Sequence, residues 1–229
     1  MNLYFLVEGK RCERKLYPAW LAQLAPHLTR VQQIQDVTTN CYYLISGEGY
    51  PSLLDVHLAN AIQDVEQSGQ FDLLVVVLDS DEDDWGDREE IVRKASASAS
   101  PPLTQAKLVV VVQHRCLETW LLGNRRIFVR NPQSPELRRY IAHFNVCVDD
   151  PEAMPNVDTF ATHAQFHHDY LRRIFQERNI SYTKSRPGAA ASQAYLAKLI
   201  ERTEENPTHL RSFASFLALC ASCHSSTDG

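Results

Sequence analysis

Long apolar runs are missing from this 229-residue sequence. No stretch approaches the roughly 20 consecutive apolar residues that a membrane-spanning helix needs, so we expect no contact with a membrane. The first residues carry no positively charged stretch and no small-residue cleavage site of the kind found in secretory signals. The six cysteines are scattered, and a cytosolic chain of this size does not need disulfide bonds. We therefore expect a cytoplasmic protein with reduced thiols.

A complete phosphate-binding loop of the nucleotide-hydrolase type is missing as well. Gly47 and Gly49 stand one residue apart, but no longer glycine pattern and no Lys-Ser or Lys-Thr pair follows them. This glycine pair predicts a turn before a helix.

The net charge of −5 hides an uneven distribution of acids. Residues 79–90, with the sequence DSDEDDWGDREE, contain eight acids and one base. Outside this segment, 20 acids face 22 Lys and Arg residues, so the rest of the chain is slightly basic. Concentrated acid on a nearly neutral chain suggests a cation site, and a solvated acidic loop is the simpler alternative.

Short apolar runs alternate with helix-like segments in the first half of the chain. Leu3–Val7 and residues 73–78 and 108–112 are continuous apolar runs, typical of strands that are covered on both faces of a parallel sheet. Residues 31–37 and 41–45 also predict strands, because they are rich in β-branched and aromatic residues. Helical periodicity is found between these runs, at residues 12–28, 51–65 and 84–94. The alternation predicts an α/β fold with a mostly parallel sheet flanked by helices.

The second half of the chain has a different character. Residues 161–178, 188–204 and 208–220 all predict helices. We therefore expect two parts: an α/β core of residues 1–124, and a helical C-terminal part of residues 125–229 that packs on it.

Acidic residues follow the predicted strands. Glu8 comes directly after the first strand, Asp79 and Asp81 follow the strand at 73–78, and Glu118 comes shortly after the strand at 108–112. Ligands of open α/β sheets gather at the carboxyl ends of the strands. On an extended exit from a strand, residues i and i+2 point the same way, so Asp79 and Asp81 could aim two carboxylates at one hard cation such as Mg²⁺.

Three segments carry a resemblance to a known family. VEGKRCERKLY begins at Val7, VVVLDSDED at Val75, and VVQHRCLETWLLGN at Val111. A strand ending in Glu-Gly, followed some 70 residues later by a strand ending in Asp-x-Asp, resembles the TOPRIM fold of topoisomerases, bacterial primases and nucleases of the overcoming-lysogenization-defect group. The combination of all three segments most resembles the DUF4276 group of TOPRIM-like proteins.

This resemblance implies roles for individual residues. Glu8 would act as general acid and base and as a metal ligand, beside the metal ligands Asp79 and Asp81. Glu13 and Glu118 would be further ligands or organisers, and Lys184, in YTKSRPG, would lie near the phosphate. The remaining residues expected at the site are the bases that would contact the nucleic acid: Lys10, Arg11 and Arg186.

The activity implied is cleavage of nucleic-acid phosphodiester bonds with one or two Mg²⁺ or Mn²⁺ ions. The substrate would be DNA or a structured RNA such as tRNA, and the residues do not decide between them. DUF4276 proteins are often encoded beside ABC-type ATPases, which implies such an ATPase as partner and a role in bacterial antiviral defence. The helical tail beyond residue 125 resembles no topoisomerase or primase.

Two other functions remain open. Asp79-Ser80-Asp81 after an apolar strand is similar to the motif of haloacid-dehalogenase phosphatases, in which the first Asp is a nucleophile and Gly-Thr or Val usually follows. Here Glu82 and Asp83 follow instead, and the motif is not in the first strand. The other alternative is a non-catalytic binding subunit of an ATPase complex.

Overall fold

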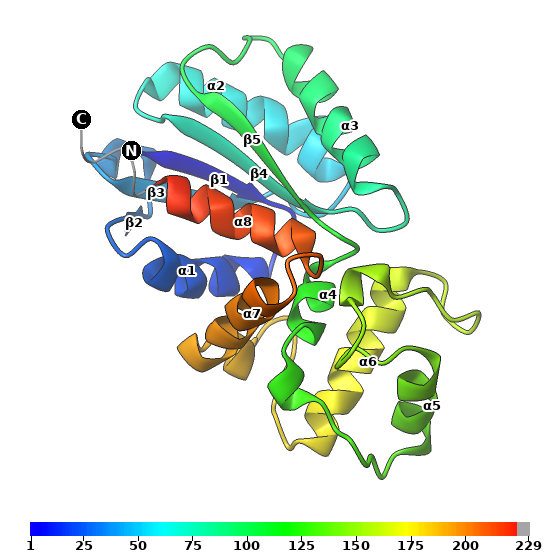
Figure 1. The fold of residues 1–229 in the computed structure, drawn as a ribbon. Helices are drawn as coiled ribbons and strands as arrows, with labels where there is room; N and C mark the ends of the chain where they lie inside the picture. Colours follow the sequence, from blue (N-terminus) through cyan, green and yellow to red (C-terminus); the bar gives the residue numbers. More distant parts are fainter. Residues whose placement is uncertain (224–229) are drawn as a thin grey trace. The chain divides into compact units, whose positions relative to one another are not determined.

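The computed structural model describes residues 1–223 (Figure 1). Within them, five strands form an all-parallel sheet in the order β2-β3-β1-β4-β5. The strands are β1 (Leu3–Val7), β2 (Thr29–Val31), β3 (Cys41–Ser46), β4 (Leu73–Asp79) and β5 (Lys107–Gln113). This confirms the predicted α/β fold with a parallel sheet, flanking helices and a helical C-terminal part.

Eight α-helices and several short 3-10 or π turns accompany the strands in the described part of the chain. The α-helices are α1 (Glu13–Leu24), α2 (Leu58–Ser68), α3 (Trp85–Ala97), α4 (Leu117–Leu122), α5 (Pro135–His143), α6 (His163–Glu177), α7 (Gln193–Glu205) and α8 (Arg211–Ser222). The short turns are η1 (Ile34–Asp36), η2 (Leu53–His57), η3 (Arg125–Ile127), η4 (Pro151–Ala153) and η5 (Gly188–Ala191). Among residues 1–223, no helix combines the length and the apolar character needed to cross a bilayer.

Contacts divide the chain into two compact units. The first comprises Met1–Leu78, Asp84–Val112 and, within the described residues, 216–223, and the second comprises Asp79–Asp83 and Gln113–Ser215. The expected domain boundary between residues 124 and 125 stays a prediction.

Strand β1 lies at the centre of the sheet in the first unit. It pairs in parallel with β3 and with β4, so that Val7 is opposite both Ser46 and Val77. All five of its side chains are fully buried. A strand that is covered on both faces is largely apolar, which is why Leu3–Val7 contains no charged residue and its one hydroxyl, on Tyr4, is hydrogen-bonded to Asp64 at 2.6 Å.

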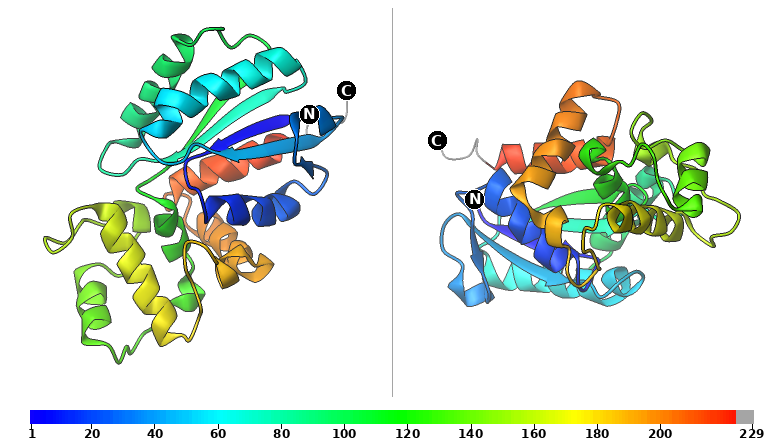
Figure 2. Two further views of the ribbon diagram at one scale, coloured as in Figure 1. Left: turned by 180° about the vertical axis from the view of Figure 1, so that it is seen from behind. Right: turned by 90° about the horizontal axis from the view of Figure 1, so that it is seen from below.

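Helices cover both faces of this sheet. Helices α2 and α3 lie on one face, where Val92 of α3 packs in the same apolar core as Leu6 and Val76 (Figures 1 and 2). Helix α1 lies on the opposite face, where the ring of Tyr17 contacts Phe216 of α8 at 5.2 Å between centroids.

The second unit is helical and contains an unusual buried cation. Arg202 of α7 is 1% exposed. Its guanidinium donates hydrogen bonds to the backbone oxygens of Gly123 (3.1 Å), Val146 (2.7 Å) and Asp149 (2.6 Å). One side chain thus ties together two segments, at Gly123 and at residues 146–149, by donating to three backbone carbonyl groups.

Two expected elements differ from the structure. The strand predicted for residues 31–37 is wrong beyond Val31, where the chain turns into η1. Val31 and Val37 are buried because they pack in the core, and their β-branched side chains do not by themselves create a strand. The helix predicted from Gly188 begins later, as α7, because Ser192 caps it by accepting a hydrogen bond from the Tyr195 amide at 3.2 Å.

Asn2 offers a direct test of how the amino-terminal edge of the sheet is held. Its side-chain amide donates to the backbone oxygens of Thr38 and Gln70, both at 2.8 Å, and its carbonyl accepts from the Cys41 amide at 2.9 Å. Asn2→Ala leaves these backbone groups without a partner and should lower the free energy of unfolding by about 2–4 kcal/mol. Urea unfolding measures this, and Gln63→Ala, at an exposed position of α2, is the control. Equal midpoints for both variants would contradict the assignment.

Glu152 in the second unit predicts a pH dependence of stability. Burial, with the nearby negative charge of Asp150, raises the pKa of Glu152 to about 7, although hydrogen bonds from Ser212 oppose the shift. The folded state therefore holds a proton that the unfolded state has lost between the ordinary value of 4.5 and about pH 7. Across this window, stability should fall as the pH rises, by about 1.4 kcal/mol per unit from this group. Unfolding curves of Glu152→Gln should lack that slope, and profiles parallel to those of wild type would refute the assignment.

Candidate functional site

The sheet changes direction between β1 and β4. From β1 the chain passes through α1 to β2 and β3 on one side of the sheet, and from β4 it passes through α3 to β5 on the other side. Helices α1 and α3 lie on opposite faces, so the loops that leave β1 and β4 diverge. Such a switch point is where open α/β sheets bind their ligands.

Acidic residues stand at both strand ends of this switch point. Glu8 is the first residue after β1, and its amide donates to the Val77 oxygen of β4 at 2.9 Å. Asp79 is the last residue of β4. Glu8 belongs to the first unit and Asp79 to the second, and both side chains are half-buried.

In the first unit, a loop after β3 holds Glu8. The Tyr50 amide donates to the Glu8 carboxylate at 3.3 Å, and the Gly49 amide donates to its backbone oxygen at 2.9 Å. Gly49 and Glu48 have φ angles of 96° and 63°, the left-handed conformation that this tight loop requires. Glu48 also pairs with Lys10 at 3.2 Å, and both of these side chains are exposed.

Gly9 is needed because of the predicted site residue Glu13. A Cβ on Gly9 would lie 1.9 Å from a carboxylate oxygen of Glu13, so the absent side chain leaves room for that carboxylate. Glu13 begins α1 and is buried, whereas Arg11 is exposed. A carboxylate in the first turn of a helix is stabilised by the helix dipole.

In the second unit, the segment after β5 shapes the Asp79–Asp83 turn. The Ser80 amide donates to the Gln113 oxygen, and the Asp81 amide donates to the Arg115 oxygen, both at 2.9 Å. The guanidinium of Arg115 donates to the backbone oxygens of Asp81 (3.2 Å) and Asp83 (2.9 Å). Backbone and side chain of Arg115 therefore both fix this turn.

The expected extended path through Asp79, Ser80 and Asp81 is wrong. The strand ends at Asp79, and Asp81 has a φ of 49°, because the Asp83 amide turns back to the Ser80 oxygen at 2.9 Å. The alternation rule for strands therefore does not set the direction of the Asp81 side chain. A non-glycine residue at this φ is uncommon, and Asp is among the few side chains that tolerate it.

Glu118 and Lys184 are brought together in the second unit. Glu118 is 3% exposed, accepts a hydrogen bond from the Tyr182 hydroxyl at 3.1 Å, and lies 3.9 Å from the Lys184 ammonium. Lys184 and Arg186 are exposed on one tight turn, which is closed by hydrogen bonds between Thr183 and Arg186. The predicted site acid Glu118 and the predicted site base Lys184 therefore form an ion pair.

The pKa of the buried Cys116 thiol indicates that Asp79 lies near Glu118. Burial raises the pKa of Cys116 most, and the negative charges of Glu118 and Asp79 raise it further. Both carboxylates are therefore close enough to act on the same buried thiol. Sequence reasoning missed Tyr182 and Arg115, although each stands within a segment that it singled out.

Two histidines of α6, His163 and His167, make polar contacts within the second unit. His163 contacts the Glu82 carboxylate at 2.5 Å. Burial raises the pKa of Glu82, but its hydrogen bonds with His163 outweigh this and the pKa is lowered overall. His167 is fully buried, approaches the Thr119 hydroxyl at 2.7 Å, and has its pKa lowered to about 3, mainly by burial. It is therefore neutral at pH 7.

The predicted site residues fall into the two units. Glu8, Lys10, Arg11 and Glu13 belong to the first, and Asp79, Asp81, Glu118, Lys184 and Arg186 belong to the second. Among residues 1–223, no three side chains of His, Cys, Asp or Glu gather closely enough to enclose a metal ion.

Fold and candidate site together define an α/β protein whose acidic residues follow two neighbouring central strands of a parallel sheet. Residues 7–203 match the family model described as "Domain of unknown function (DUF4276)". The match covers most of the chain, so the protein belongs to the DUF4276 family, as its sequence motifs predicted. The chain matches no curated protein and no solved structure. The TOPRIM assignment stays a prediction.

Arg115 provides a test of how the Asp79–Asp83 turn is held. Arg115→Ala removes two charge-assisted hydrogen bonds and should cost about 1.5–3 kcal/mol of local stability. Hydrogen exchange, followed by mass spectrometry of peptides covering residues 79–83, should then be faster. Arg93→Ala, which removes an exposed ion pair with Glu89 on α3, is the control and should cost less than about 1 kcal/mol. Unchanged protection in Arg115→Ala would contradict this role.

Proposed function

We propose that this DUF4276 protein is a divalent-metal-dependent nuclease that hydrolyses phosphodiester bonds. The observation that supports it most is the position of Glu8 and Asp79 directly after two neighbouring strands at the switch point of the sheet. Phosphodiester chemistry needs groups that neutralise developing charge and move a proton, and acids with bases nearby supply both.

The donor set suits a hard cation. Asp79, Asp81 and Glu8 offer carboxylate oxygens, the ligands that Mg²⁺ and Mn²⁺ prefer, and Glu13 and Glu118 are further acids. Mg²⁺ is usually held by one or two carboxylates together with water and substrate phosphates, so a site without three gathered acidic side chains within residues 1–223 fits Mg²⁺ bound with its substrate. A metal ion bound there would polarise the phosphate and acidify an attacking water.

The protein's own groups would do the rest. The Tyr50 amide donates to one oxygen of the Glu8 carboxylate and helps to orient it, and this carboxylate would accept or return a proton. Glu118, braced by Tyr182, would orient the exposed Lys184 ammonium toward a phosphate of the substrate.

Nucleic acid would be held by bases around these groups. Arg186 shares the turn of Lys184, and Lys10 and Arg11 follow Glu8 directly. Their charges would contact backbone phosphates, which binds DNA and RNA alike. The substrate class therefore has to come from experiment.

A non-catalytic binding subunit is the second candidate. The observation that favours it is that no three potential metal-binding side chains gather within residues 1–223. In that case the protein should bind its ATPase partner equally well after the acids are replaced, with no loss of biological effect. The haloacid-dehalogenase alternative would require turnover of an aryl phosphate that Asp79→Asn abolishes.

The setting we propose is antiviral defence in which an ABC-type ATPase partner controls the nuclease. Co-expression with a candidate ABC-type ATPase, followed by purification through a tag on either protein, would test the partnership. The proposal expects the two proteins to copurify, and cleavage to depend on Asp79 within the complex.

Cleavage assays test the central proposal. Supercoiled plasmid and total tRNA are each incubated with Mg²⁺, with Mn²⁺ and with a chelator. The protein should cleave one of them only with metal, and Asp79→Ala should lower the rate by about 100-fold or more, because charge stabilisation of the transition state is lost. Asp87→Asn is the matched control, since it removes an exposed acid from the same acidic segment. Cleavage that survives in Asp79→Ala would overturn the assignment.

A further inference from the structure

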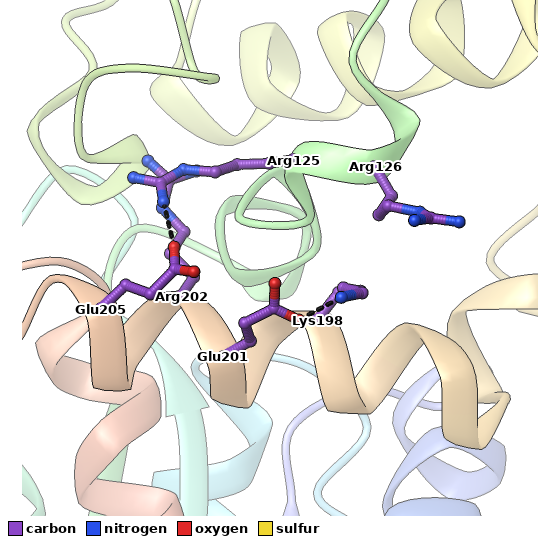
Figure 3. A pocket seen from close by; sticks show the side chains of 6 residues that line it. All are labelled: Arg125, Arg126, Lys198, Glu201, Arg202 and Glu205. Carbon is purple, nitrogen blue, oxygen red and sulfur yellow. Dashed lines mark hydrogen bonds and ion pairs between the residues drawn. The ribbon is translucent and has the colours of Figure 1, made fainter.

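A second basic site lies within the second unit, apart from the acids described above. A cavity of about 140 Å³ is lined by four bases and two acids: Arg125, Arg126, Lys198, Glu201, Arg202 and Glu205. Figure 3 shows that Arg125, on η3, extends toward Arg202 and Glu205 of α7, whereas Arg126 extends in the opposite direction; Lys198 and Glu201 also come from α7. The volume is well above the roughly 10–15 Å³ that one water molecule needs.

Positive charge is concentrated and only partly neutralised in this cavity. Arg125 pairs with Glu205 at 2.9 Å, and Lys198 pairs with Glu201 (Figure 3). Two positive charges remain after these pairings, on Arg126 and Arg202. Within residues 1–223, no carboxylate lies within ion-pairing distance of Arg126, whose side chain is exposed.

The buried guanidinium of Arg202 adds a second, independent sign of an anion site. It is 1% exposed, and its Nε has no hydrogen-bond partner within the described residues, as is also true of the Nε of Arg125. Burial, and then the positive charge of Arg125, lower the pKa of Arg202 to about 10. Two guanidinium groups that repel each other, each with a buried donor still unused, are a costly arrangement that a bound anion would relieve.

We propose that this cavity binds a phosphate group, with Arg126 and Lys198 as the accessible contacts and the half-buried Arg125 and the buried Arg202 as further positive charge. Arginine forks match phosphate oxygens in geometry and charge. The phosphate could belong to a nucleic-acid backbone or to a free nucleotide, and both offer the same chemistry. This proposal does not depend on nuclease activity.

Calorimetric titration in the presence of a chelator tests it, because without metal no cleavage can interfere. The probes are pyrophosphate, a mononucleotide and a short single-stranded oligonucleotide, each at low salt. Arg126→Gln and Lys198→Gln should each weaken binding of pyrophosphate about tenfold or more, as expected for a lost charge-assisted hydrogen bond. Arg130→Gln removes the same charge from an exposed position nearby in the sequence and should leave the affinity within about twofold.

The three probes separate the sources of phosphate. Tighter binding of the oligonucleotide than of the mononucleotide, lost in Arg126→Gln, identifies a nucleic-acid backbone site. Tighter binding of the mononucleotide, lost in the same variant, identifies a nucleotide site. The proposal is overturned if the folded wild-type protein binds none of the probes, or if Arg130→Gln weakens binding as much as Arg126→Gln does.

Discussion

The parallel pairing of β1 with β3 and with β4 places the candidate site. Its five side chains are fully buried, so the register of this strand is fixed by packing on both faces as well as by hydrogen bonds. A slip of one residue would exchange the side chains between the two faces of the sheet. With that register set, Glu8 directly follows β1, and Asp79 is the last residue of the neighbouring strand β4.

The Asp79–Asp83 turn depends on polar contacts instead of apolar packing. Backbone groups of Gln113 and Arg115 and the guanidinium of Arg115 hold it within the second unit. Similar networks recur elsewhere in that unit, where buried Glu118 and Arg202 and half-buried Glu152 each receive or donate hydrogen bonds. Burying a charged side chain costs free energy unless the charge is paired and hydrogen-bonded. These hydrogen bonds therefore offset the cost of keeping the charged side chains inside the second unit.

Much of the fold was predictable from local patterns. Four strands were located within one residue at each end, because continuous apolar runs are distinctive when a strand is buried on both faces. The edge strand β2 was not located correctly. Its three residues form a strand because they pair with β3, and not because of their own side chains. The positions of Glu8 and Asp79 were predictable because each residue directly follows one of these continuous apolar runs.

Other parts of the site could not be read from the sequence. The pairing of Glu118 with Tyr182 and Lys184 joins residues 64 and 66 positions apart, and no periodicity encodes such a contact. The left-handed Asp81 depends on hydrogen bonds from a different segment, so an argument from strand alternation failed there. The basic cavity between η3 and α7 was missed because paired arginines are common on solvated helices.

The central proposal is that Asp79 and Asp81 bind a divalent cation. A titration of Mn²⁺ followed by electron paramagnetic resonance tests it directly, with and without nucleic acid and independently of turnover. The account predicts that wild type and Asp87→Asn remove the signal of free Mn²⁺ when nucleic acid is present, and that Asp79→Asn and Asp81→Asn do not. Binding that is equal in all four proteins, or absent from wild type with nucleic acid present, would contradict it.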